Sequence, residues 1–346
     1  MNIAVTGKGE AHAFECSVGE NILYAGLRSG LTLPYECGTG TCGTCKARLT
    51  AGDTTSAWPE APGYTGLKPG DVLMCQALAA GDCAVEVNSA VTRVPSTGIV
   101  PVHVGAIIRG RTTLIHDVAT LDLDLDQPVD FEAGQFMVMT APGISGGRAY
   151  SMVNYDRRTE HLVLVIKEKP GGRFSEWLFG DGAVDGTRVH LFGPLGHATF
   201  SSDLGKNVLC IAGGSGIAGM MAILSCACRA GYFDAHEGHL FFGVRTGRDL
   251  FFADELKALI ATSPGRLHVT VALSDEDVDP AFAAAHPEFA FGKGFVHAVA
   301  GSAMKGKFAD VRAYAAGPPP MVSATLRMLL LEGKLKSAVI RYDKFS

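Results

Sequence analysis

The sequence lacks any excess of positive charge: 30 Lys and Arg stand against 35 Asp and Glu, a net charge of −5. This argues against the extended basic face that nucleic acid requires, and no nucleic-acid partner is expected. The first ten residues, MNIAVTGKGE, lack the basic start and apolar run of a secretory signal. We therefore expect a cytoplasmic protein with reduced thiols. One uncharged run, residues 208–228, has the length of a membrane span, but glycines interrupt it, so no membrane association is predicted.

Four of the nine cysteines follow the pattern of an iron–sulfur site. Cys37, Cys42 and Cys45 have the spacing C-x4-C-x2-C, and Cys75 follows at a longer interval, which is the plant-type [2Fe–2S] pattern. The Gly and Thr residues between them let the backbone approach the cluster. Two disulfides or a zinc site are the alternatives. Reduced thiols disfavour the first, and a single C-x2-C disfavours the second.

Local patterns divide the chain into three units. Residues 1–92 combine a strand hairpin, a helix over 21–28 and the cysteine loop, in the order of a β-grasp ferredoxin, an α+β fold. Residues 101–204 carry many period-2 strands, among them 121–126, and predict an antiparallel β-barrel. Residues 205–346 alternate apolar strands with helices and predict a doubly wound α/β domain. Residues 91–98 are a polar linker that permits movement.

Glycine-rich segments predict two nucleotide sites. Gly171-Gly172-Arg173-Phe174-Ser175 opens a short helix, a setting that binds phosphate through free N–H groups. It follows Arg148-Ala149-Tyr150-Ser151, so an arginine, a tyrosine face and a helix start are available to a flavin nucleotide. Gly213-Gly214-Ser215-Gly216-Ile217 follows a strand and opens a helix, as dinucleotide-binding turns do. Tight strand–helix packing is the alternative explanation for that turn.

With these motifs in order, the chain resembles the three-domain NADH reductases of bacterial oxygenases over nearly its whole length. It is most similar to the reductase components of soluble diiron monooxygenases of the toluene and alkene type, because of the segment Trp58-Pro59-Glu60-Ala61-Pro62-Gly63. Reductases of Rieske dioxygenases share the architecture and stay open as the alternative. The resemblance implies a [2Fe–2S] cluster, FAD and NADH as cofactors. It also implies a monomer that meets an oxygenase component, or that component's ferredoxin, transiently.

The resemblance implies roles for matched residues. Arg148, Gly172 and Ser175 would bind the FAD pyrophosphate, Tyr150 would lie against the isoalloxazine, and Ser151 would bond near flavin N5. The turn from Gly213 to Ile217 would hold the NADH phosphates, and Gly317 and Pro318 would lie beside the nicotinamide. Phe345 would cover the flavin ring, which makes Ser151, Tyr150 and Phe345 the predicted catalytic group. Ala149, Ile166, Lys167 and Gly171 complete the predicted cofactor contacts.

Ala316 stands where the family commonly has cysteine, close to the hydride path. Hydride transfer depends on positioning and needs no nucleophile, so activity should survive. Asp275 and Glu276 would repel the 2′-phosphate of NADP, whereas Arg245 would favour it; we predict NADH, with a solvated acidic turn as the alternative.

A redox sensor or scaffold without turnover is the competing class of function. The sequence contains no signalling output such as a DNA-binding module, and sustained NADH oxidation with an artificial acceptor would separate the two.

Overall fold

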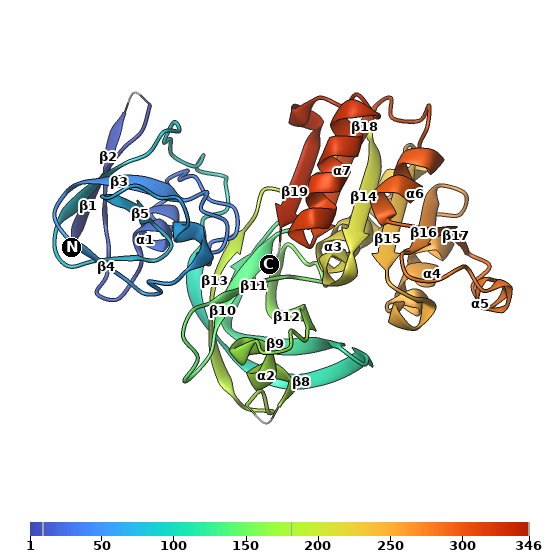
Figure 1. The fold of residues 1–346 in the computed structure, drawn as a ribbon, viewed down its shortest axis with the longest axis horizontal. Helices are drawn as coiled ribbons and strands as arrows, with labels where there is room; N and C mark the ends of the chain where they lie inside the picture. Colours follow the sequence, from blue (N-terminus) through green and yellow to red (C-terminus); the bar gives the residue numbers. More distant parts are fainter. Residues whose placement is uncertain (9, 181, 345–346) are drawn as a thin grey trace.

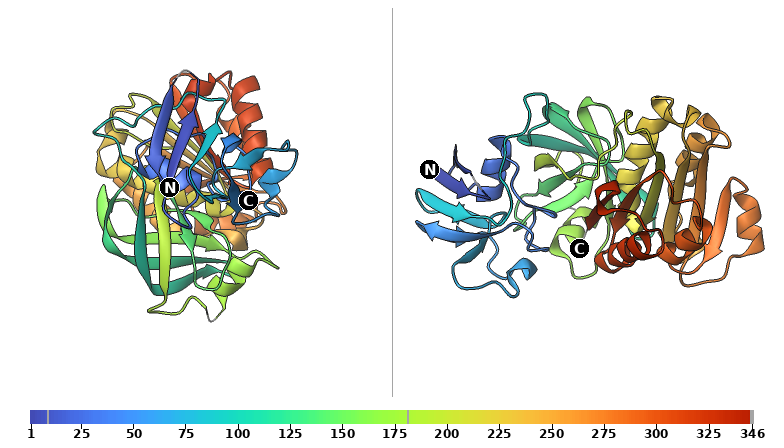
Figure 2. Two further views of the ribbon diagram at one scale, coloured as in Figure 1. Left: turned by 90° about the vertical axis from the view of Figure 1, so that its left-hand side faces the viewer. Right: turned by 90° about the horizontal axis from the view of Figure 1, so that it is seen from above.

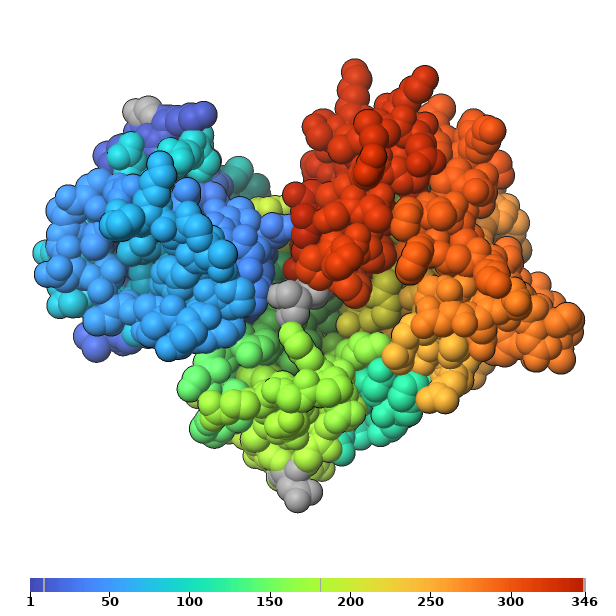
Figure 3. Space-filling view, in the orientation of Figure 1, coloured from blue at the N-terminus to red at the C-terminus, as the bar shows by residue number. Residues whose placement is uncertain are grey.

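The computed structural model describes residues 1–8, 10–180 and 182–344. The chain forms three units, and the views in Figures 1 and 2 place the middle one between the other two. In the space-filling view of Figure 3, the N-terminal and C-terminal units are separate lobes above the middle unit. Within the described ranges, no helix is long and apolar enough to cross a bilayer. The predicted unit limits (1–92, 101–204 and 205–346) stay predictions.

The N-terminal unit is a mixed sheet with one helix, as the β-grasp prediction requires. Its strands lie in the order β2-β1-β7-β3-β5, with β1 and β2 as the predicted antiparallel hairpin. Ile3 and Val5 are fully buried between exposed neighbours, which explains the alternation in β1. The bounds are β1 Asn2–Thr6, β2 Ala11–Glu15, α1 Ile22–Arg28, β3 Lys46–Ala51, β4 Thr54–Ser56, β5 Asp71–Leu73, β6 Ala77–Ala79 and β7 Cys83–Glu86.

The middle unit is the predicted antiparallel barrel. Its strand order is β11-β10-β13-β8-β9-β12, and every neighbouring pair is antiparallel. A bridge between Met152 and Leu164 joins the two ends of this sheet and closes it. The bounds are β8 Val102–Ile115, β9 Val118–Asp130, β10 Phe136–Thr140, β11 Arg148–Ser151, β12 Arg158–Lys167, α2 Arg173–Phe179 and β13 Arg188–Leu195.

The C-terminal unit is a parallel sheet with helices on both faces, which confirms the doubly wound prediction. All neighbouring strands are parallel, in the order β17-β16-β15-β14-β18-β19. The chain adds β15, β16 and β17 on one side of β14 and then β18 and β19 on the other, so the strand order reverses between β14 and β18. The uncharged run at 208–228 divides into β14, a glycine turn and α3, as predicted. The bounds are β14 Asn207–Gly213, α3 Ile217–Arg229, β15 Gly238–Val244, α4 Ala253–Thr262, β16 Leu267–Leu273, α5 Pro280–Ala285, β17 Phe289–Lys293, α6 Val296–Ala303, β18 Val311–Gly317, α7 Pro319–Leu331 and β19 Ile340–Lys344.

The N-terminal unit and the barrel share one hydrophobic core. Four barrel side chains on β10 and β13 pack into the same apolar cluster as the interior of the N-terminal unit: Phe136, Val138, Phe192 and Leu195. The start of the linker is held to the N-terminal unit, since Thr32 N donates to Thr92 O at 2.8 Å and Val94 N donates to Gly30 O at 2.8 Å. Thr92 and Arg93 are exposed all the same, and so are all residues of the second half, 95–98.

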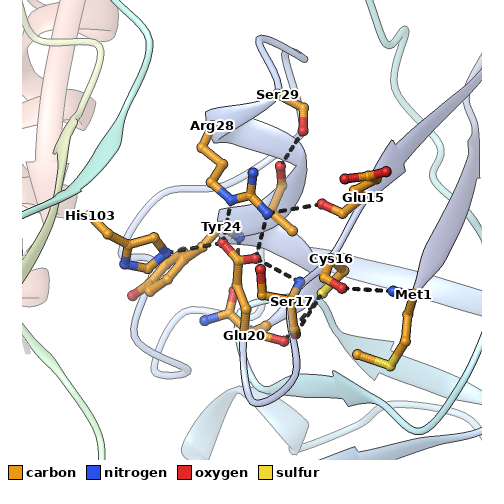
Figure 4. Close-up of polar contacts among 11 residues, drawn as sticks. Met1, Glu15, Cys16, Ser17, Glu20, Tyr24, Arg28, Ser29 and His103 are labelled. Carbon is orange, nitrogen blue, oxygen red and sulfur yellow. Dashed lines mark hydrogen bonds and ion pairs between the residues drawn. The ribbon is translucent and has the colours of Figure 1, made fainter.

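Glu20 adds a polar contact across the same boundary (Figure 4). Its side chain is only 6% exposed and accepts hydrogen bonds from Arg28 Nε at 2.7 Å and from Ser17 N at 3.0 Å. His103 Nε2, on β8 of the barrel, lies 3.0 Å from the Glu20 carboxylate. Burial alone would raise the pKa of Glu20, but these hydrogen bonds outweigh it and hold the pKa below its ordinary value.

A Glu20→Gln variant should be less stable at pH 7 than the parent, by about 1–3 kcal/mol, because Arg28 loses its charged partner. The folded-state pKa of Glu20 is lowered, so its contribution exists above the unfolded pKa and disappears as pH falls through the folded one. Urea unfolding at pH 7 and at about pH 3.5 would measure this. A Glu60→Gln control, at an exposed carboxylate, should change little at either pH. An equal loss for Glu20→Gln at both values would contradict the charge-based explanation.

Candidate active site

The cysteine loop connects α1 to β3 and turns back on itself through glycines. Gly38, Gly40 and Gly43 have φ values of 68°, 94° and 76°, in the left-handed region that favours glycine. Gly63 N donates to Gly40 O at 2.9 Å, and a side chain on Gly63 would clash with this loop at 2.7 Å. The backbone conformation therefore favours glycine at positions 38, 40 and 43, and close packing on the loop favours it at position 63.

The four predicted ligands come together as two pairs of thiols. Cys45 Sγ lies 3.2 Å from Cys75 Sγ, and Cys37 and Cys42 lie close enough to shift each other's pKa. In each pair the pKa of one thiol, Cys37 or Cys45, is lowered and that of its partner is raised. In the part of the chain that the structure describes, no three His, Cys, Asp or Glu side chains gather to hold one metal ion. Two pairs fit a two-iron cluster better than a single zinc.

This site has a buried side and an open side. Cys37, Cys45 and Cys75 are at most 5% exposed, whereas Cys42 is exposed. On the buried side, Tyr24 Oη donates to Gly38 O at 2.9 Å. Burial raises the pKa of Tyr24 well above its ordinary value, which keeps the phenol protonated as a donor.

The predicted flavin strand lies one strand away from this contact. Arg148, Ala149, Tyr150 and Ser151 form β11, which pairs with β10. The Arg148 guanidinium lies over the rings of Trp58, from the N-terminal unit, and Phe174, on α2, at 5.6 and 5.9 Å. Ser151 is only 6% exposed and faces Gly219 on α3. The strand therefore lies where all three units meet.

The turn before α2 is held by Ser175. Its hydroxyl oxygen lies 2.8 Å from Lys169 O and 2.9 Å from Gly172 O, two acceptors for its single hydrogen. The hydroxyl thus closes its own turn, so its predicted pyrophosphate contact stays a prediction. Gly171 has a φ of 73°, the left-handed conformation that the turn needs.

A cavity of about 250 Å³ opens at the carboxyl ends of β14, β15, β16 and β18. Five predicted residues line it: Lys167, Gly213, Gly214, Arg245 and Pro318. The sheet order reverses between β14 and β18, and open α/β sheets bind ligands at that point. The cavity is therefore well placed for a dinucleotide.

Other predicted residues do not line this cavity. Ile166 and Ile217 are fully buried in apolar cores, and Gly216 packs against β18, where an added Cβ would lie 2.3 Å from Ala316 O. Asp275 accepts a hydrogen bond from Ser274 Oγ, and Glu276 accepts one from Gly247 N. Ser215 and Gly317 lie outside the lining, and Phe345 lies outside the described residues.

Several lining residues were not predicted from the sequence. Ile115 comes from the barrel, and the others come from strand ends, connections and helix starts of the C-terminal unit: Gly243, Val244, Asp249, Phe251, Ala272, Ser274, Gly294, Phe295, Val296 and Met321. Gly243 and Ser274 stand at or just after the ends of predicted parallel strands, so the sequence could have placed them at the ligand-binding edge of the sheet. The sequence gives no comparable reason to place the apolar lining residues there.

Arg245 is held at this cavity by two carboxylates. Its Nη2 lies 3.4 Å from Asp117, in the turn between β8 and β9, and 3.4 Å from Asp249. Lys167 also pairs with Asp117, at 3.2 Å. Burial would raise the pKa of Asp249, but hydrogen bonds from Thr246 and the charge of Arg245 lower it overall. The guanidinium is thus neutralised by groups from both the barrel and the C-terminal unit.

Comparisons with known proteins agree with this arrangement. Three family profiles match: the 2Fe-2S iron-sulfur cluster binding domain at residues 5–80, the oxidoreductase FAD-binding domain at 105–200, and the oxidoreductase NAD-binding domain at 210–327. A ferredoxin–NAD(P)⁺ reductase of Metapseudomonas resinovorans is 34% identical over 95% of this chain and 96% of its own length. The ferredoxin–NAD⁺ reductase component of an alkene monooxygenase system of Xanthobacter autotrophicus is 32% identical, covering 97% and 98%.

Two solved structures cover essentially the whole chain. The ferredoxin reductase in carbazole 1,9a-dioxygenase has a TM-score of 0.84 at 33% identity and covers 100% of this chain and 99% of its own. An Amycolatopsis cytochrome P450 reductase has a TM-score of 0.79 at 29% identity and covers 99% and 98%. The fold and the site define a flavin- and iron–sulfur-dependent oxidoreductase. The chain belongs to the three-domain ferredoxin–NAD(P)⁺ reductases, with [2Fe–2S], FAD and NAD as cofactors.

Proposed function

We propose that the protein is the reductase component of a bacterial multicomponent monooxygenase, which oxidises NADH and delivers single electrons to the oxygenase. When bound, FAD accepts the hydride and releases its two electrons one at a time, and the [2Fe–2S] cluster carries them singly. One observation carries this proposal: the cysteine loop packs on β10 and β13 of the barrel, beside the flavin strand β11, and presents Cys42 to solvent on its open side.

We assign the cluster to residues 1–92, FAD to 101–204 and NADH to 205–346. Cys37 and Cys42 would hold one iron and Cys45 and Cys75 the other. The chain's role at this centre is to exclude water from three thiols and to leave one edge accessible to an acceptor.

For the flavin, Arg148, Ala149, Tyr150 and Ser151 would supply contacts from β11, and Gly171, Gly172 and Ser175 from the turn before α2. Arg148 is already oriented by the Trp58 and Phe174 rings, so its charge is available to pyrophosphate at little conformational cost. Ser151 and Tyr150 would contact the ring system, and Phe345 would cover it until nicotinamide binds.

NADH is the proposed electron donor because Arg245 is already paired with Asp117 and Asp249. An arginine near the adenosine ribose accommodates the 2′-phosphate of NADP when it is free to do so. Two carboxylates compete for this guanidinium, and Asp275 and Glu276 add negative charge beyond the next strand. Gly213, Gly214 and Pro318 would contact the phosphates and the nicotinamide end.

The acceptor is proposed to be an oxygenase component or its ferredoxin, met in a small, transient complex. Relatives in alkene, phenol and xylene or toluene monooxygenase systems support the monooxygenase. The likeness to the ferredoxin reductase in carbazole 1,9a-dioxygenase favours a dioxygenase system as the second candidate. We propose a cytoplasmic monomer.

Anaerobic mixing with NADH should bleach both the flavin and the iron–sulfur absorbance bands. With NADPH at the same concentration, the rate of bleaching should be at least about tenfold lower. The expected difference arises because Arg245 is already paired with carboxylates and Asp275 adds negative charge, which disfavours the 2′-phosphate of NADPH. Equal rates with both nucleotides would contradict the NADH assignment. Bleaching of the flavin bands alone would contradict the electron relay.

A Cys75→Ala variant should lose the iron–sulfur bands and its iron and acid-labile sulfide, while keeping the flavin. Cys83→Ala is the matched control, because Cys83 is equally buried in the same unit and lies in β7, outside the cysteine loop. Metal analysis of both purified variants tests the ligand assignment. Full iron content in Cys75→Ala would show that the ligand set is wrong.

Reconstitution should separate the two acceptor classes. We expect NADH-driven turnover when the protein is mixed with a diiron monooxygenase hydroxylase, and at least about tenfold less with a Rieske dioxygenase and its ferredoxin. Cytochrome c reduction, measured in parallel, controls for an active reductase. The reverse ranking would select the dioxygenase system.

A further inference from the structure

An aromatic stack crosses the boundary between the N-terminal unit and the barrel. The ring of Tyr24, on α1, lies 3.9 Å from the ring of Phe192, on β13, with an interplanar angle of 14°. The ring of His103, on β8, lies 4.7 Å from Phe192 and 6.2 Å from Tyr24, and Figure 4 shows His103 beside Tyr24 and Glu20. The ion pair between Glu20 and His103 therefore lies at the edge of the stack and holds the His103 ring in place.

Tyr24 also holds the cysteine loop itself. Its hydroxyl donates to Gly38 O at 2.9 Å, and Gly38 follows Cys37 directly. A Cβ on Gly38 would lie 3.2 Å from Leu195 Cδ1 and 3.6 Å from Val138 Cγ2, so the loop backbone is in contact with the barrel at this point. One side chain thus binds the loop through its oxygen and the barrel through its ring.

The barrel residues in this contact adjoin the flavin strand. Val138 is the register partner of Phe192 on one side and of Ala149 on the other. The cysteine loop therefore packs on β10, the direct neighbour of β11, and Val138 and Ala149 belong to the same apolar packing. Electron transfer depends steeply on such separations, so whatever fixes the loop on β10 and β13 fixes the rate.

We propose that Tyr24 is a positioning residue for electron transfer inside the chain: its stack on Phe192 and its bond to Gly38 O hold the cysteine loop at the flavin side of the barrel. The proposal rests on the proposed function. In the step concerned, the flavin side is oxidised by one electron and the cluster side is reduced by one, and Tyr24 itself neither gains nor loses an electron or a proton. The first unit acts as a docked module in this step, and its linker does not have to move.

The test compares four variants of the full-length, cofactor-loaded protein. Tyr24→Leu removes both contacts, Phe192→Leu removes the stack from the barrel side, and Tyr24→Phe removes only the bond to Gly38. Tyr64→Phe is the matched control, since Tyr64 donates to Ser56 inside the N-terminal unit at 2.9 Å. Anaerobic stopped-flow mixing with NADH records flavin and iron–sulfur bleaching separately, and hydrogen exchange reports the protection of residues 36–40.

We expect Tyr24→Leu and Phe192→Leu to slow iron–sulfur bleaching by about tenfold or more, because small misplacements cost rate steeply. Flavin bleaching and the cluster potential should stay unchanged, and exchange at 36–40 should rise. Tyr24→Phe should show a smaller slowing, and Tyr64→Phe none. Slowing confined to the second phase is a change that general loss of stability would not produce.

Unchanged iron–sulfur bleaching in both Leu variants would overturn the proposal, and so would equal slowing of the flavin and iron–sulfur phases. The parent protein decides the underlying function separately. If NADH fails to bleach both bands in the parent, the proposed function is wrong. If the parent behaves as expected and the variants match it, only the role of Tyr24 is wrong.

Discussion

The dry contact between the cysteine loop and strands β10 and β13 is the constraint on which the electron-transfer arrangement depends. Gly38 has the left-handed φ of 68° that favours glycine, Val138 and Leu195 of the barrel lie against it, and Tyr24 stacks across the boundary between the two units. The interiors of the first unit and the barrel are continuous here. An intimate contact of this kind replaces the diffusional encounter that a separate ferredoxin would need, and it places the cysteine loop on β10, the strand next to β11.

The second organising feature is the reversal of strand order between β14 and β18. Gly213 at the end of β14 lines the cavity, and the barrel closes one side of the cavity with Ile115 and Lys167. The dinucleotide cavity therefore belongs to two units. Asp117, far away in the sequence, takes part in the charge balance around Arg245. In the proposed function, nucleotide selectivity would for that reason be a property of the interface between the barrel and the C-terminal unit.

The features that could be predicted from the sequence are those set by a single continuous segment. The cysteine spacing, the small residues within it and the glycine turn after β14 are demanded by the backbone of the segment itself, and alternation at residues 121–126 reports a strand with one wet face. Contacts between distant segments leave no such trace: neither Phe295 at the cavity nor Phe192 under Tyr24 differs in sequence from an ordinary core residue. Charge alone predicts a role for Asp275 and Glu276, and neither lines the cavity; each accepts a local hydrogen bond, from Ser274 Oγ and from Gly247 N.

The exposure of Cys42 has a consequence for the lifetime of the protein. An edge that admits an electron acceptor also admits oxygen and peroxide, and sulfur oxidation follows thiolate character and access. Cys37, Cys45 and Cys75 are shielded by packing, so oxidative wear should begin at one thiol and one end of the centre. In the proposed complex, a docked acceptor would cover that end. We therefore expect Cys42 to be oxidised more slowly when an acceptor is bound than when the protein is free in aerated solution.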